Sequence, residues 1–255
     1  MKQILSYRHL IKNLVVKDLK LKYRDSVFGF LWSLLNPVFM IVTYVIAFKY
    51  IMKASAPNYV LFLLAGVLHW NLFAQCLSAS TGAVVDNAGL VKKVYFPLEA
   101  LPLGAIFFSL VQYLFALVVF FPVALIFLHL RLSWVLLLVF PILFLQILFS
   151  IGLGFLVSTI TVFYRDVKHF VEIFLMLGFW LTPVVYQFTD VPVRARAWIA
   201  DNPMTDFISS YQSVLLHNQT PAPLFWRNML IAVFLSLLIG AWTFSRFKTR
   251  FAEEI

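Results

Sequence analysis

Long apolar segments alternate with short polar or basic segments along almost the whole chain. A helix needs about 20 predominantly apolar residues to cross the hydrocarbon core of a bilayer. Six segments approach or exceed that length, and they predict six transmembrane helices. We place these helices at residues 30–51, 59–80, 103–128, 133–162, 171–188 and 228–246. The fourth is long enough to tilt or to kink at Pro141, and the fifth is short and ends at Thr182-Pro183.

Composition also predicts a polytopic membrane protein of the all-α class. Of the 255 residues, 62% are hydrophobic and 12% are charged, whereas soluble domains carry about 45–50% apolar and about 25% charged residues. We divide the chain into an arm at residues 1–29 and a six-helix membrane domain at residues 30–255. The first residues contain no apolar core region, so we expect no cleavable signal peptide. The single Cys76 excludes an internal disulfide and a multi-cysteine metal site.

Charge predicts the orientation of the chain in the membrane. An even number of spans puts both termini on one side. With the termini in the cytoplasm, 14 Lys and Arg residues lie inside and 6 lie outside, which satisfies the positive-inside rule. The same bias accounts for the net charge of +9, so we expect no nucleic-acid partner.

The arm has the pattern of an amphipathic helix in the plane of the membrane surface. Its apolar side chains fall within about 140° of a helical wheel. They are Ile4, Tyr7, Leu10, Ile11, Leu14, Val15 and Leu21, and the basic side chains Arg8, Lys12, Lys17, Lys20 and Arg24 fill the rest. We expect the apolar face in the acyl boundary and the basic face toward anionic headgroups. Such a helix either anchors the topology alone or also gates the cytoplasmic mouth.

Residues 82–100 form a loop that is too polar to cross the membrane and too apolar to be a free linker. A small apolar face lies beside two lysines, and Pro97 ends the segment. The residues concerned are Leu90, Val91, Lys92, Lys93, Val94 and Tyr95. The segment is either a second interfacial helix or a helix that docks into a groove on a partner protein.

Two further segments are informative. Arg165 and Asp166 follow the fourth span, where they either tie two helix ends together or form a weak surface pair. Residues 189–227 contain four prolines and apolar runs too short to cross the bilayer. These runs predict re-entrant or interfacial helices, which we regard as an outer gate segment.

Several chemistries lack their residues. No Gly-rich phosphate loop, no nucleophile elbow and no His-Glu-x-x-His motif is present. The scattered His residues predict no metal site, and Glu172 is the one carboxylate expected near a span interior. We therefore predict a non-enzymatic protein with no catalytic residue and no cofactor of its own. A transporter of this kind takes its energy from a separate ATP-hydrolysing subunit.

Short motifs in order along the chain resemble those of a known family. Lys22, Tyr23, Arg24, Ser26, Gly29, Trp32 and Pro37 fill the slots of its amino-terminal signature, although Lys22 stands where Arg and Phe28 where Leu is more frequent. The Lys92-Lys93 to Pro97 loop, Tyr164-Arg165-Asp166, Thr182-Pro183 and Asn202-Pro203 follow. The chain thus resembles the permease subunits of ABC exporters of the ABC-2 superfamily that move O-antigen, capsule or teichoic-acid polymers.

The resemblance implies an assembly and a substrate. Two permeases would pair as a homodimer in the bacterial inner membrane with two ATP-binding cassette subunits, which would bind ATP and Mg²⁺. The substrate would be a glycan on a polyprenyl pyrophosphate lipid. The loop at 82–100 would contact the ATPase, and Lys22, Tyr23, Arg24, Arg165 and Asp166 would form a cytoplasmic gate and corner. An ABC exporter of drugs or lipids is the alternative, and the sugar, the polymer length and the host type stay open.

A conduit for such a polymer is expected on spans one and five. With Trp32 at 0° on a helical wheel, one face of about 80° mixes aromatic and polar residues. That face comprises Phe28, Trp32, Asn36, Phe39, Thr43 and Tyr50, and the corresponding stripe of span five comprises Glu172, Phe179 and Tyr186. Weak contacts with aromatic planes and polar groups would hold a polymer and still let it slide. Aromatic packing between helices is the other interpretation.

Overall fold

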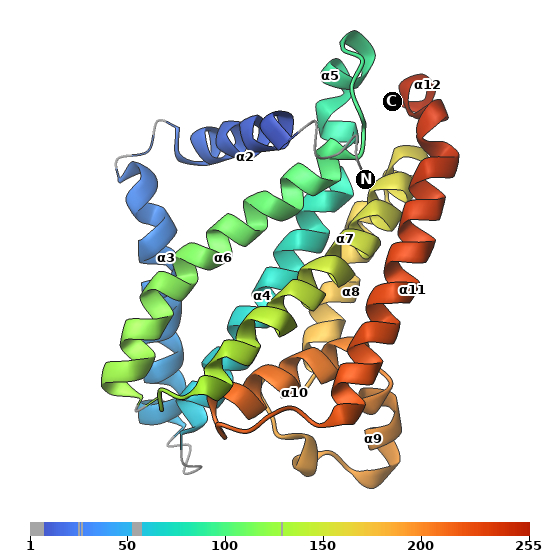
Figure 1. Ribbon diagram of the computed structural model, residues 1–255. Helices are drawn as coiled ribbons and strands as arrows, with labels where there is room; N and C mark the ends of the chain where they lie inside the picture. The colour runs from blue at the N-terminus through green and yellow to red at the C-terminus, as the bar shows by residue number, and fades with distance from the viewer. Residues whose placement is uncertain (1–7, 25, 27, 53–57, 129) are drawn as a thin grey trace.

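The structure is a computed structural model that describes residues 8–24, 26, 28–52, 58–128 and 130–255. All regular structure in these ranges is helical (Figure 1), which confirms the all-α class. The α-helices are α2 (Arg8–Tyr23), α3 (Trp32–Tyr44), α4 (Tyr59–Gly82), α5 (Ala88–Lys93), α6 (Ala100–Phe127), α7 (Val139–Phe163), α8 (Val167–Trp180), α9 (Val193–Ala200), α10 (Pro203–Leu215), α11 (Pro223–Phe247) and α12 (Phe251–Glu254). Short helices of other types are 3-10 turns at Gly29–Leu31, Val85–Asn87, Trp134–Leu138, Phe188–Asp190 and Lys248–Arg250, and a π-helix at Val45–Ile51.

Four helices in the described residues are long and apolar enough to cross a membrane: α4, α6, α7 with the 3-10 turn before it, and α11. They match the second, third, fourth and sixth predicted spans. Pro141 lies in the first turn of α7, just after that 3-10 turn. A proline is tolerated there because the N–H groups of a first turn have no partner within the α-helix.

The first and fifth predicted spans are shorter helices. The α-helical part of the first ends at Tyr44 and continues as a π-helix to Ile51. The fifth, α8, has 14 residues and is therefore about 21 Å long. The chain turns after Trp180 and does not stay helical to residue 188, because Thr182-Pro183 interrupts the hydrogen-bond ladder.

Helix α4 is the centre of the molecule. In its most apolar window 83% of the residues are buried, whereas the three other long helices reach 39% at most. Helices α6, α7, α8 and α10 all pack on it. A helix that is apolar on nearly all sides is expected in such an interior position.

Helices α7 and α11 cross at backbone contact. A Cβ added to Gly240 would lie 1.9 Å from the Gly152 oxygen, and one added to Gly152 would lie 2.3 Å from the Ser236 carbonyl carbon. Ser236 and Gly240 are four residues apart, so both lie on the same face of α11. Small residues at this spacing let membrane helices approach closely.

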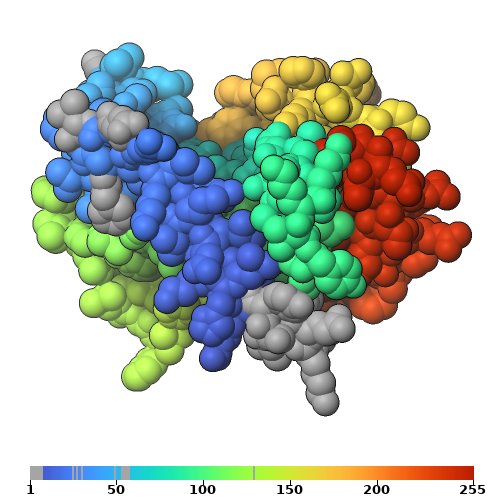
Figure 2. Space-filling model, turned by 90° about the horizontal axis from the view of Figure 1, so that it is seen from above, coloured from blue at the N-terminus to red at the C-terminus, as the bar shows by residue number. Residues whose placement is uncertain are grey.

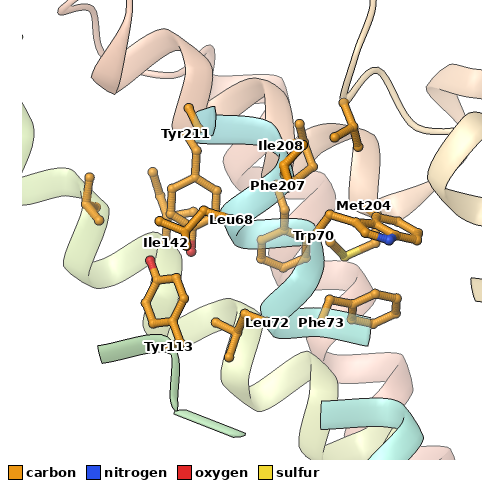
Figure 3. Packing of buried hydrophobic residues seen from close by; sticks show 14 of the residues in the cluster. Leu68, Trp70, Leu72, Phe73, Tyr113, Ile142, Met204, Phe207, Ile208 and Tyr211 are labelled. Atoms are coloured by element: carbon orange, nitrogen blue, oxygen red, sulfur yellow. The ribbon is translucent and has the colours of Figure 1, made fainter. Parts of the chain in front are cut away.

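A buried polar network joins four helices inside the core, and Figure 3 shows two of its members, Tyr113 and Tyr211. The Tyr113 hydroxyl lies 2.8 Å from His69 Nε2, and Tyr211 donates to Gln146 Oε1 at 2.8 Å. Gln146 in turn donates to the His69 carbonyl at 2.8 Å. His69 Nδ1 faces the Ala65 carbonyl, which only accepts, so Nδ1 carries the proton and Nε2 accepts from Tyr113. The network connects α10 to α4, α6 and α7, and it satisfies every group that it buries.

The two ends of the bundle differ in character. Helix α2, helix α5 and the C-terminal α12 lie at one end, and α9 and α10 lie at the other (Figure 1). Helix α2 runs across the bundle and places Leu14 against Gly104 of α6. Leu14 is buried in protein and Leu21 is exposed, so the predicted apolar face packs largely on α6 rather than on lipid. The predicted positions Ile4 and Tyr7 lie outside the described residues.

Candidate functional site: a polar groove between α3 and α8

A groove runs along one face of the molecule between α3 and α8, with α4 as its floor (Figure 2). Two cavities occupy it, of about 150 Å³ beside α3 and about 510 Å³ beside α8. Both are lined by Lys22 of α2 and Gln75 of α4. The first also reaches Asn36 and the second reaches Glu172, so residues predicted from spans one and five meet along one surface.

The floor of the groove is a polar stripe on α4 that the sequence analysis missed. Asn71, Gln75 and Ser78 line these cavities, and Gln75 and Ser78 are exposed although most of α4 is buried. They follow the spacing i, i+4, i+7, which places them on one helix face. That spacing in an apolar span was the signal available in the sequence. The amide side chains of Asn71 and Gln75 face the groove, so they give it its hydrogen-bonding capacity.

The arm reaches the groove at the end where α2 lies. Lys22 Nζ and the Tyr23 hydroxyl donate to Gln112 Oε1 at 3.0 and 2.9 Å. Burial lowers the pKa of Lys22 from its ordinary value. The side-chain nitrogen of Gln112 is buried and has no hydrogen-bond partner among the residues that the structure describes. A buried donor without a partner is costly, and such groups occur where a ligand or a second conformation satisfies them.

The predicted face of span one is mostly unoccupied by protein. Phe28, Asn36, Phe39 and Thr43 are exposed, and Trp32 is half-buried with its ring edge against Phe28 at 5.6 Å between centroids. Tyr44 and Phe48 of the same span instead pack on each other, and Phe48 also packs on Tyr59.

Tyr50 falls beyond the α-helical part of this span. A π-helix bonds i to i+5, so it turns less per residue than the wheel assumes. The wheel position of Tyr50 therefore does not follow from the α-helical spacing. Its side chain is 65% exposed.

Span five divides into an exposed and a packed part. Glu172 is exposed and lies 3.7 Å from His169 Nδ1. Phe179 packs edge-on against Trp70 of α4, and Tyr186 donates to the Trp180 carbonyl at 3.0 Å. Of the three residues predicted on this span, Glu172 alone lines either groove cavity.

The loop at 82–100 contains the short helix α5, and its predicted face divides in two. Leu90 and Val91 are half-buried against an apolar cluster that contains Leu14, Phe96 and Phe251. Val94 and Tyr95 are 51% and 104% exposed, and Lys92 and Lys93 are exposed beside them. The exposed part lies at the tip of the molecule beyond α5 (Figure 1).

Three lysines from distant segments hold this loop. Lys17 of α2 donates to Asn87 at 3.1 Å, Lys168 of α8 pairs with Asp86 at 2.8 Å, and Lys248 near the C-terminus pairs with Glu99 at 2.7 Å. In the part of the chain that the structure describes, Arg165 and Asp166 form no ion pair and both are exposed. The ion pair at this corner is made instead by Lys168, which was given no role from the sequence, and it joins α8 to the loop at 82–100.

The opposite end of the bundle is built where two of the sequence motifs meet. Asn202 begins α10 by accepting from the Met204 N–H at 3.0 Å, and its amide donates to Thr182 Oγ1 at 2.8 Å. Gln212 donates to the Pro183 carbonyl at 3.1 Å. A Cβ on Gly66 would lie 2.7 Å from the Val184 oxygen, so the chain after α8 lies directly on α4. Thr182-Pro183 and Asn202-Pro203 thus form one joint between α8 and α10.

No group of three His, Cys, Asp or Glu side chains that could hold a metal ion occurs in the described ranges. The groove offers amides, hydroxyls, aromatic rings, one lysine and one carboxylate. This is a surface for weak, repeated polar contacts, which favours a membrane protein of the permease class.

Comparison with known proteins agrees with that class. The chain belongs to the ABC-2 type transporter family, whose model matches residues 9–216.

Similar proteins extend over nearly the whole chain. An O-antigen export system permease protein RfbA of Klebsiella pneumoniae is 33% identical over 243 residues, which is 93% of this chain and 91% of that protein. A protein of the same name from Myxococcus xanthus is 31% identical over 259 residues, with 100% and 98% covered. The polysialic acid transport protein KpsM of Escherichia coli is 22% identical over 210 residues, with 78% of each covered.

Proposed function

We propose that this chain is the permease subunit of an ATP-driven exporter of lipid-linked polysaccharide, of the O-antigen, capsule or teichoic-acid class. The names of its relatives support that substrate class. Two copies work with two ATP-binding subunits, which hold ATP and Mg²⁺ and hydrolyse the nucleotide. The complex lies in the bacterial cytoplasmic membrane, with both termini of this chain in the cytoplasm.

The observation that carries the proposal is the polar floor of the groove between exposed aromatic side chains. Asn71, Gln75 and Ser78 offer donors and acceptors to sugar hydroxyls. Phe39, exposed on α3 one turn after Asn36, and the exposed Phe28 before α3 offer flat apolar faces to sugar C–H groups. A second copy facing this side would close the groove into a conduit.

Within the conduit, we assign substrate-facing roles to Phe28, Trp32, Asn36, Phe39, Thr43, Tyr50 and Glu172, and supporting roles to Phe179 and Tyr186. The Phe179 ring packs on Trp70 and supports α8, and the Tyr186 hydroxyl bonds the Trp180 carbonyl and supports the turn after α8. Lys22 and Tyr23 gate the cytoplasmic end through Gln112. Arg24 continues the arm that carries the gate.

The ATPase contact is assigned to the exposed tip of the loop at 82–100. Lys92, Lys93, Val94 and Tyr95 present an apolar and basic surface to the partner. Leu90 and Val91 anchor the tip to the apolar cluster beneath it. A displacement of the tip is passed on to the arm, α8 and the C-terminal segment through the three lysine contacts. Arg165 and Asp166 stand at the corner that moves with Lys168.

The test is export in cells that lack the chromosomal permease gene and carry this chain together with its ATPase. Gln75→Leu should reduce surface glycan at least fivefold while the ATPase still co-purifies, because it removes the central polar contact of the floor. Thr243→Val, at a half-buried position of α11 that lines neither groove cavity, is the control and should export normally. Normal export by Gln75→Leu would contradict the assignment of the groove.

A second measurement separates glycans from other cargo. ATP hydrolysis by the purified complex should rise with lipid-linked glycan and not with hydrophobic cations. Stimulation by cations alone would favour an exporter of drugs, and stimulation by glycan-free polyprenyl phosphate alone would favour an exporter of lipids.

A further inference from the structure

A further cavity, separate from the two in the groove, lies at the end of the bundle that carries α9 and α10. Its volume is about 430 Å³, within the range of about 300–1,000 Å³ that is usual for small-molecule sites. It lies between the start of α4, the face of α10, the start of α11 and the chain at 187–189. Gln187 and Leu224 on its rim are exposed, so the cavity opens to the surface.

The floor of this cavity holds a carboxylate with unused hydrogen-bonding capacity. Asp206 is 5% exposed and accepts a hydrogen bond from Asn228. In the part of the chain that the structure describes, it forms no ion pair. An ionised carboxylate has about four acceptor sites, so most of its capacity faces the cavity. The Ser209 hydroxyl beside it makes no hydrogen bond within the described residues, which adds a donor.

The rest of the lining combines aromatic rings with amide and hydroxyl side chains and one histidine, His217. Phe62, Phe188 and Phe225 contribute aromatic rings, and neither Lys nor Arg is among the lining residues. An anion would meet the carboxylate without compensation, and a purely apolar ligand would leave Asp206 unsatisfied. A neutral molecule rich in hydroxyl groups, with one apolar face, satisfies both halves of the cavity.

The cavity also adjoins the end of span five. Gln187 and Phe188 of its lining directly follow Tyr186, which we assign to the conduit. Gln212, another lining residue, is bonded to Pro183 just before it. A polymer that leaves the groove past this turn therefore comes within reach of the cavity.

We propose that this cavity binds a single neutral sugar residue of the emerging polysaccharide, with Asp206, Ser209 and Asn228 bonding its hydroxyls. The inference rests on the proposed function. Such a site retains the leading part of the polymer on the outer side while the ATPase subunits reset. The affinity for one sugar is low, because a tight site would stop the polymer from sliding.

Saturation-transfer NMR on the permease–ATPase complex in lipid nanodiscs tests the site directly. The probes are glucose, galactose, mannose, rhamnose and N-acetylglucosamine at millimolar concentration, with glycerol as a non-sugar control. At least one sugar should receive saturation, and the transfer should fall at least threefold in Asp206→Asn and in the cavity-filling variant Ser209→Phe. Asp201→Asn alters an exposed acid that does not line the cavity and should leave the transfer unchanged. The proposal would be overturned if no sugar received saturation, or if the transfer in both cavity variants equalled that in the wild type.

Surface glycan in cells separates this inference from the function on which it rests. If sugars bind through Asp206 and glycan export does not depend on this chain, the proposed function fails and the site stands. If export depends on this chain and on Gln75 but no sugar binds through Asp206, the site fails and the function stands. Asp206→Asn keeps the size of the side chain, so lost binding in a variant of unchanged or higher thermal stability reflects the lost carboxylate.

Discussion

At the scale of single residues, the buried polar groups are of two kinds: those whose hydrogen bonds are made within the protein and those with unused hydrogen-bonding capacity. His69, Tyr113, Gln146 and Tyr211 satisfy one another deep in the core. The Gln112 nitrogen and the Asp206 carboxylate are buried with unused capacity, and each lies at a cavity that we assign to the substrate. Unsatisfied polar groups in a protein that otherwise pairs them mark places where a ligand completes the bonding.

The Asp206 carboxyl gives a prediction for stability against pH. Burial raises its pKa from 3.8 to about 6, against a smaller opposite effect of the Asn228 hydrogen bond. A carboxyl whose folded pKa is raised stabilises the fold below about pH 4 and loses that contribution as the pH rises through about 6. Asp206→Asn should therefore melt a few degrees higher than the wild type at pH 8, and the difference should shrink at pH 5. Thermal melts in detergent measure this, and equal melting temperatures at pH 8 would contradict it.

How far the sequence predicts this site depends on the kind of interaction. The stripe Asn71, Gln75 and Ser78 is visible in the sequence, because three polar residues at helical spacing interrupt an apolar span. The contact of Asn202 with Thr182 is not, because it joins residues 20 apart across a turn of irregular backbone. Asp86 with Lys168 is likewise a tertiary pairing that neither local pattern contains.

At the scale of helices, length and hydropathy identify the spans, and packing sets their ends. Helices α4, α6, α7 and α11 match their predicted spans because burial in lipid requires a continuous apolar run. The π-helix after Tyr44 and the early end of α8 escape prediction, since hydropathy does not change there. Both irregular ends lie beside the proposed conduit, where irregular backbone is tolerated if it lines a cavity.

The crossing of α7 and α11 gives a prediction for folding. Gly240→Ala forces a Cβ to within 1.9 Å of the Gly152 carbonyl oxygen, and a backbone atom cannot move aside without parting the helices. Overpacking of this kind costs about 3 kcal/mol or more. Size-exclusion chromatography and thermal melting of the purified permease should show aggregation or a lower melting temperature by at least 5 °C. Gly89→Ala, with nothing within 4 Å of the added Cβ, should behave as the wild type. Equal stability of the two variants would show that the crossing tolerates separation.

Helix α5 gives a prediction for coupling. Val94→Asp with Tyr95→Asp changes only exposed side chains at the tip, so insertion and folding should be unaffected. The added charges should weaken ATPase co-purification at least tenfold and abolish export. Val91→Asp is the contrasting variant, because Val91 packs on the apolar cluster and its loss should lower the melting temperature as well. Normal ATPase retention by the double variant would refute the proposed contact.

At the scale of the whole molecule, three lysine contacts connect the segments at the end that carries α2, α5 and α12. Each lysine contact of the loop at 82–100 is partly exposed, and such pairs contribute about 0–1 kcal/mol each. Their structural effect is to join the arm, α8 and the C-terminal segment to one loop. Figure 2 shows this loop between the arm and the C-terminal segment. In the proposed mechanism, a displacement of the loop is therefore passed on both to the helix that flanks the groove and to the arm that bonds Gln112.

The basic residues at the end that carries α2, α5 and α12 predict the topology of the chain, which can be measured. The loop at 82–100, the corner at 163–170 and residue 250 share one end of the bundle, and α9 lies at the other (Figure 1). Because the sequence assigns 14 of the 20 basic residues to the side of the arm, these two loops and the C-terminal segment, that end should face the cytoplasm. Cys76 is buried, so a Cys76→Ser background leaves single cysteines at Lys92, Arg250 or Ala197 as the reactive positions. In intact cells with an accessible outer face, an impermeant maleimide should label position 197 alone, and positions 92 and 250 should react only after permeabilisation. Labelling at 92 or 250 in intact cells with none at 197 would invert the topology and, with it, the assignment of the groove's gate and of the sugar cavity to their two sides.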